Sequence, residues 1–138
     1  MNPPALSFMD ANVIMYAIGG VHPYREPCVM LLQKIKSGEV RVVSNTEVLR
    51  EILYRYFSIK KPFIAESAYT SLVELCEQIL PVTLKDMQRA LELLKRNPDV
   101  TPRDAVHAAT MIHNGIKKIH STDPHFDRIP GIRRIKPA

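Results

Sequence analysis

Short apolar runs alternate with amphipathic stretches along this chain, and the alternation is typical of an α/β domain built on a parallel sheet. The apolar runs predict strands over residues 6–9, 40–43, 79–82 and 119–122, and a short edge strand over 132–135. Helical spacing predicts helices over 26–35, 48–56, 62–77, 84–95 and 101–113. Thr101–Pro102 is a good helix start, and Ser44–Asn45–Thr46 offers several N-caps for the helix that follows.

Length and composition favour one ordinary domain that spans residues 1–138. Apolar residues make up 46% of the chain, which is enough for a hydrophobic core without disulfide staples. Cys28 and Cys76 share no motif, so we expect them to be small buried hydrophobes in a reducing, cytoplasmic setting. No signal peptide or apolar membrane span is visible in the sequence. The formal charge of +5 suits a polyanionic partner such as RNA, although many basic proteins bind no nucleic acid.

Acidic residues occupy the positions where an α/β sheet forms its sites. Asp10 follows the first predicted strand and Asp123 follows the fourth, so both face one crevice if those strands are neighbours. Asp104 lies in the first turn of its helix. Glu47 and Glu51 are four residues apart and share one face of another helix.

Each acid also has a purely structural interpretation. Asp10 could cap a helix, Asp104 could interact with a helix dipole, and Asp123 before Pro124 fits a turn. Glu47 and Glu51 could be ordinary solvated charges. The aspartates become informative jointly, because one fold would bring them to the same edge of the sheet.

Clustered carboxylates predict a cation. Two like charges about 4 Å apart repel by roughly 1–4 kcal/mol at dielectric constants between those of water and a protein surface. Hard oxygen ligands favour Mg²⁺ or Mn²⁺, which can activate water and stabilise charge on a phosphate. The sequence contains no cysteine–histidine spacing typical of structural zinc.

Basic and histidine residues are less specific. His107, one turn after Asp104, could orient a ligand or contact RNA, and a hydrogen-bonded, half-buried histidine is the favoured interpretation. Arg103 is a candidate phosphate contact, with an exposed arginine as the alternative. His22, His113, His120 and His125 have no spacing that indicates a metal site.

Three segments together resemble the PIN-domain family, in particular the VapC-like toxins of toxin–antitoxin pairs. They are FMDANVIMYA from Phe8, TPRDAVHAAT from Thr101 and STDPHFDRIPG from Ser121. The similarity extends from about Phe8 to Pro137. The resemblance implies a three-layer α/β/α sandwich with a central parallel sheet.

The resemblance also implies roles for individual residues. Asp10, Asp104 and Asp123 would hold Mg²⁺ or Mn²⁺, and Glu51 would complete the acidic ring, with Glu47 as its competitor. Further members would act around this ring: Asn12, Ser121 and Thr122 through hydrogen bonds, and Asp127 through water.

The activity implied is endoribonuclease cleavage that leaves a 5′-phosphate and a 3′-hydroxyl. The leading hypothesis is a toxin that an antitoxin inhibits and that forms a homodimer through helices within residues 62–96. The alternatives are a processing nuclease without an antitoxin and a catalytically silent RNA-binding module.

Overall fold

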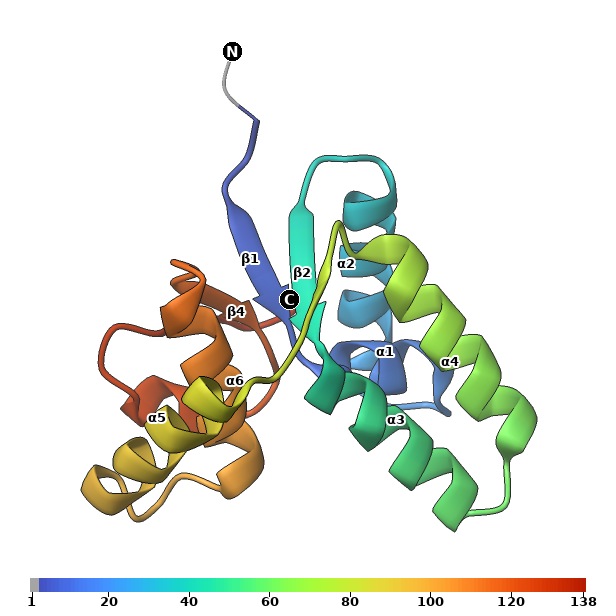
Figure 1. Cartoon of the computed structure of the whole chain (residues 1–138). Coiled ribbons are helices and arrows are strands. Elements are labelled where there is room, and N and C mark those ends of the chain that lie inside the picture. The colour runs from blue at the N-terminus through green and yellow to red at the C-terminus, as the bar shows by residue number, and fades with distance from the viewer. Residues whose placement is uncertain (1–2) are drawn as a thin grey trace.

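A parallel five-stranded sheet forms the centre of the molecule (Figure 1). This computed structural model describes residues 3–138. The strand order is β3-β2-β1-β4-β5, and every neighbouring pair is parallel. The strands are β1 (Leu6–Met9), β2 (Arg41–Asn45), β3 (Ile79–Leu80), β4 (Lys118–His120) and β5 (Arg133–Ile135).

Helices cover both faces of this sheet. Figure 1 shows α1 to α4 gathered on one side of the strands and α5 and α6 on the other. The predicted three-layer α/β/α sandwich is therefore confirmed. The helices are α1 (Ala11–Ile18), α2 (Arg25–Lys36), α3 (Thr46–Ser58), α4 (Pro62–Leu75), α5 (Leu84–Arg96) and α6 (Pro102–His113), with a 3₁₀ turn, η1 (Pro124–Arg128).

The chain order reverses between β1 and β4. The connections after β1 and β2 move outward to β2 and then β3, whereas the connection after β3 returns to β4 on the far side of β1. Crossover connections between parallel strands are right-handed, so reversing direction along the sheet puts α5 and α6 on the face opposite to α1–α4. The carboxyl ends of β1 and β4 therefore form the crevice where α/β sheets place their sites.

Helix α1 is the main element that the sequence did not predict. Its residues are apolar on several sides, because it packs against α2, α3 and α4. All of its residues except Asn12 are apolar, so no polar stripe marks it as an amphipathic helix. The strand predicted over 119–122 ends earlier, at His120, so two residues separate β4 from Asp123.

The predicted start of α6 is confirmed. Thr101 is the N-cap and its side chain accepts the Asp104 amide at 3.2 Å, with Pro102 as the first helical residue. Cys28 and Cys76 are free and buried, as expected. Across residues 3–138, none of the helices combines the length and the apolarity that a bilayer crossing requires.

Candidate metal centre

Asp10 lies at the carboxyl end of β1, where the chain turns into α1. Its Oδ1 accepts the amide of Ala11 at 2.8 Å, so the side chain does cap a helix. Its Oδ2 accepts the Ser121 hydroxyl at 2.7 Å and the Asn12 amide at 3.2 Å. The capping interpretation and the site interpretation of Asp10 are thus compatible, because the cap leaves this carboxylate at the sheet edge.

Ser121 connects the ends of β1 and β4. Its hydroxyl donates to Asp10 and accepts from the Asn12 side chain at 3.1 Å and from the Asp123 amide at 3.0 Å. The side chain is fully buried. Thr122 contributes its backbone amide, which donates to Asn12 Oδ1 at 3.3 Å. One hydroxyl therefore holds the carboxylate of Asp10 and the backbone of Asp123.

We expect Ser121→Ala to reduce metal affinity or cleavage by roughly 10- to 100-fold, the usual range for partners that orient metal ligands. The physical reason is that Asp10 Oδ2 loses its shortest donor. Calorimetric titration with Mg²⁺ measures the effect. Ser37→Ala is the matched control, because Ser37 is exposed and donates only to Lys34 O. Equal affinities in the two variants would contradict this role of Ser121.

Asp104 and Asp123 form a second pair of acids. One oxygen of each carboxylate and a ring nitrogen of His125 lie within 4.8 Å of one another. Asp104 is fully buried, and neither of its oxygens has a hydrogen-bond partner among residues 3–138. Burial raises the pKa of Asp104 to about 7, and two further effects act in the same direction: a protonated Asp104 can share its proton with the adjacent Asp123 carboxylate, and the charges of Asp10 and Asp123 disfavour ionisation.

Asp123 is held differently. Its Oδ1 accepts the His125 amide at 2.9 Å, which caps η1, and lies 3.0 Å from the His125 ring. Burial would raise its pKa, but Asp104 and His125 lower it on balance. Two acids of the same crevice are therefore driven toward opposite protonation states. His125 was not predicted, because its proximity to Asp123 depends on the geometry of the 3₁₀ turn.

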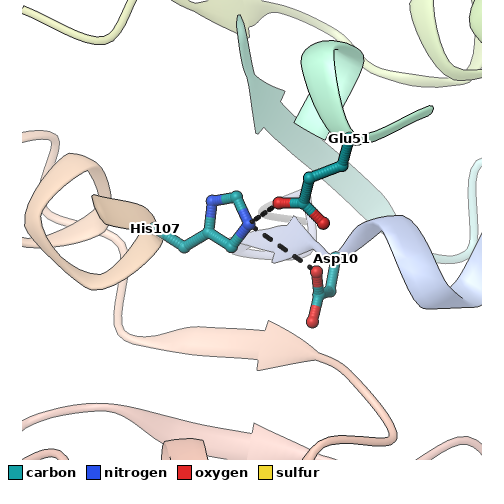
Figure 2. A group of neighbouring side chains, drawn as sticks. All are labelled: Asp10, Glu51 and His107. Atoms are coloured by element: carbon teal, nitrogen blue, oxygen red, sulfur yellow. Dashed lines mark hydrogen bonds and ion pairs between the residues drawn. The ribbon is translucent and has the colours of Figure 1, made fainter. Parts of the chain in front are cut away.

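Glu51 reaches the same edge from α3. It is buried, and its Oε1 lies 2.7 Å from Nε2 of His107, which is 3.7 Å from Asp10 Oδ1 (Figure 2). Burial raises the pKa of Glu51, although the hydrogen bond from His107 opposes this. Glu47 instead pairs with Arg50 on the same helix. The structure thus brings Glu51 to the cluster and leaves Glu47 outside it.

His107 has hydrogen-bond partners, as expected, but its burial differs from the expectation. It was predicted to be half-buried with a possible contact to RNA, but its exposed fraction is 0%. A side chain without accessible surface cannot contact a nucleic acid. The burial follows from the position of α6, whose inward face packs on Phe8 and Phe126.

Arg103 joins the two groups of acids. Its Nε lies 3.8 Å from Glu51 Oε2 and 3.6 Å from Asp104 Oδ1, and its side chain is 49% exposed. It lines an open cleft together with Asp10, Glu51, Arg50, Arg55 and Tyr54. Asp127 lies apart, in an exposed ion pair with Arg134 at 3.0 Å. Arg134 also donates to the Ser121 carbonyl, so Asp127 is linked to the site only through this arginine.

The donor set fits a divalent cation. Buried carboxylate oxygens without a partner are costly, and those of Asp104 face neighbouring acids. Each group combines two carboxylates, which suit hard cations, with one histidine nitrogen, and no cysteine belongs to either group found among residues 3–138. The structure brings the predicted acids together as two groups, with Asp10 and Glu51 in one and Asp104 and Asp123 in the other, and each group could hold an ion.

Comparisons with known proteins agree with this geometry. The family model described as "PIN domain" matches residues 7–132. Ribonuclease VapC13 of Mycobacterium tuberculosis is 35% identical over 127 residues, which cover 92% of this chain and 97% of that protein.

Solved structures show the same fold. The M. tuberculosis toxin VapC20, described as cleaving the sarcin-ricin loop, superposes with a TM-score of 0.74 at 18% identity, covering 91% of this chain and 95% of that chain. A toxin–antitoxin complex from Klebsiella pneumoniae gives a TM-score of 0.68 at 14% identity, covering 96% and 98% of the two chains.

Proposed function

The chain belongs to the PIN domain family, and from this premise we propose that it is a metal-dependent endoribonuclease whose site is the acidic edge formed by Asp10, Glu51, Asp104 and Asp123. The observation that carries the proposal is Asp104. It is fully buried, and both of its oxygens lack a partner in the described part of the chain. Burying an acid without a partner is costly, and a cation among the carboxylates removes that cost. A silent RNA-binding module would have no need of such an acid.

Asp104 and Asp123 would hold the ion together with Asp10, whose charge acts on Asp104 from the neighbouring group, and we propose Mg²⁺ or Mn²⁺ on the basis of their hard oxygen donors. When bound, such an ion lowers the pKa of water and offsets charge on a phosphate. Glu51 would orient the attacking water and accept its proton, because its Oε2 is not engaged by His107. Ser121 and Asn12 would hold Asp10 in place through their hydrogen bonds.

RNA would approach along the cleft that Asp10 and Glu51 line. Arg50, Arg55 and Arg103 line it and would contact phosphates on either side of the scissile bond. Arg103 also stands between Glu51 and Asp104, where it partly offsets their charge before a cation binds. Its half-exposed guanidinium is free to turn toward a phosphate once the ion takes over that role.

The test is cleavage of RNA by the purified chain with and without metal. We expect EDTA to stop cleavage and added Mg²⁺ or Mn²⁺ to restore it, with new 5′ ends mapped by sequencing. Cleavage that is indifferent to the chelator would overturn metal dependence. No cleavage of any RNA with metal present, by a chain that binds RNA, would favour the silent module.

The two glutamates of α3 provide a matched pair of variants. We expect Glu51→Gln to slow cleavage by at least about 100-fold, since a positioned proton acceptor typically contributes that much. Glu47→Gln should stay within about twofold of the parent, because Glu47 is already paired with Arg50. Single-turnover rates at saturating Mg²⁺ measure both. The reverse order of effects would make Glu47 the fourth acid of the site.

We also propose a protein antitoxin and a cytoplasmic location. Support for the antitoxin comes from the structural similarity to the toxin–antitoxin complex of K. pneumoniae, and support for the location from the two buried free cysteines. A short reading frame beside the gene whose product suppresses cleavage would test the first point. Without such a partner, the chain is the processing nuclease considered above.

The homodimer remains a prediction. Exposed apolar side chains do occur within residues 62–96: Phe63, Ile64, Tyr69 and Val73 on α4, and Leu84, Met87 and Leu91 on α5. Sedimentation velocity measures the mass in solution. A monomer at all accessible concentrations would contradict the predicted homodimer.

A further inference from the structure

A chain of hydrogen bonds runs from the start of α3 through His107 to Glu51. Asn45 ends β2 and is the N-cap of α3, and its Oδ1 accepts the amide of Val48 at 3.0 Å. Its Nδ2 lies 3.1 Å from Nδ1 of His107 and 3.1 Å from the Thr110 hydroxyl. On its other side, His107 Nε2 lies 2.7 Å from Glu51 Oε1, as Figure 2 shows. Asn45 and His107 are fully buried.

The orientation of the Asn45 amide follows from this network. A backbone amide is always a donor, so the atom of Asn45 that faces Val48 must be the oxygen. Rotating the amide by half a turn would bring two donors together and remove the cap of α3. The nitrogen of Asn45 therefore points at His107, and both of its hydrogens are used.

The tautomer of His107 follows in turn. An amide donor at Nδ1 requires a lone pair on that nitrogen, so the ring proton lies on Nε2 and is donated to Glu51. Burial lowers the pKa of His107, and the hydrogen bond to Glu51 with the charge of Asp10 raises it on balance. A proton on Nδ1 would nevertheless meet the Asn45 amide, which has no other orientation available.

This protonation state decides what His107 can do. Its Nε2 is within reach of Asp10 and Glu51, so by distance alone the three side chains could share a cation. A nitrogen that carries a proton has no lone pair for a metal. We infer that His107 is not a ligand but a positioning residue, which the Asn45 amide holds as the Nε2–H tautomer so that it fixes the Glu51 carboxylate.

The bond from His107 decides which oxygen of Glu51 is available to the reacting groups. The bond from His107 occupies Oε1 of Glu51 and leaves Oε2, on the side of Arg103, for the reacting groups. His107 belongs to α6 and Glu51 to α3, so the bond also ties together two helices that approach the sheet edge separately. This inference rests on the proposed nuclease function for the role of Glu51, but not for the protonation state of His107.

The direct test is the nitrogen-15 spectrum of the histidine side chains in the intact protein, without and with Mg²⁺. We expect His107 to show a protonated Nε2 and an unprotonated Nδ1 in both conditions. Loss of the Nε2 proton when Mg²⁺ binds would make His107 a ligand and overturn the inference. A ring protonated at both nitrogens, or at Nδ1 alone, would also overturn it.

Variants test the positioning role. His107→Leu removes the donor and should lower kcat by roughly 10- to 100-fold with little change in KM for RNA, as expected for loss of an orienting partner. His107→Gln keeps an N–H donor and should recover most of that loss. Equal rates in the two variants, both folded by circular dichroism, would contradict the role.

Asn45→Asp is a nearly isosteric probe of the same chain. An aspartate still accepts the Val48 amide and so keeps the cap of α3, but it offers His107 Nδ1 an acceptor. We expect the ring proton to move from Nε2 to Nδ1, where it is donated to the introduced carboxylate; Glu51 then loses its donor and kcat falls. An unchanged spectrum and rate would show that Asn45 does not set the tautomer of His107, and would overturn the inference. Absence of RNA cleavage by a parent protein that shows the expected tautomer would overturn the nuclease proposal alone.

Discussion

Asp104→Asn should abolish metal-dependent cleavage and at the same time stabilise the metal-free protein. The parent carboxyl is fully buried without a hydrogen-bond partner among residues 3–138, and its pKa is raised from 3.8 to about 7. A group whose folded pKa lies above its unfolded value binds more protons in the native state between the two values. The free energy of unfolding therefore falls as pH rises from about 4 to about 7.

The size of this effect has an upper bound. Each pKa unit corresponds to about 1.4 kcal/mol, so a pKa raised from 3.8 to about 7 allows at most about 4 kcal/mol. Interaction with Asp123 and Asp10 shares that amount among several groups. We expect Asp104→Asn to increase the free energy of unfolding by on the order of 2 kcal/mol at pH 8, which raises Tm by roughly 5–10 °C. At pH 5 the gain should disappear, because the parent carboxyl is then already neutral.

Thermal unfolding in EDTA at the two pH values measures this difference, and RNA cleavage in Mg²⁺ measures the loss of activity. Asp99→Asn is the matched control, since Asp99 is an exposed acid whose side chain is 73% accessible and pairs with Arg128. A variant that is less stable than the parent at pH 8 and still cleaves would contradict both the burial argument and the proposed ligand.

Metal affinity should rise steeply with pH up to neutrality. Below about pH 7 a cation must displace a proton from Asp104, so affinity increases by about tenfold for each pH unit. Between pH 5 and 7 this amounts to about 100-fold, and above pH 7 the dependence should flatten. The raised pKa of Glu51, which results from its burial, acts in the same direction at the acid end.

Calorimetric titration with Mg²⁺ in buffers of different ionisation enthalpy counts the protons released. We expect close to one proton per ion at pH 6 and few at pH 8. Asp104→Asn should bind Mg²⁺ weakly at both pH values and without the proton release. Affinity that is flat from pH 5 to 8 would show that no buried acid is neutralised by the ion.

The local elements of this protein could be predicted because their signals are short-range. Thr101 followed by Pro102 starts α6 through a side-chain cap, and the apolar run over 6–9 forms β1. Helix α1 escaped prediction because all of its residues except Asn12 are apolar, so no polar stripe marks its period. The strand before Asp123 ends at His120, and the Ser121 hydroxyl that follows it accepts the Asp123 amide.

By itself the sequence determined that this is an α/β chain in which Asp10, Asp104 and Asp123 stand at element ends, since element type and position follow from periodicity and capping. The tertiary structure decided the rest. It placed Glu51 at the acidic edge and left Glu47 with Arg50, although both lie on one face of α3. It also buried His107 completely and set Asn45 against it. Such choices depend on contacts between residues 56 and 62 positions apart, and distances of that kind appear only when helices from both faces meet at the sheet edge.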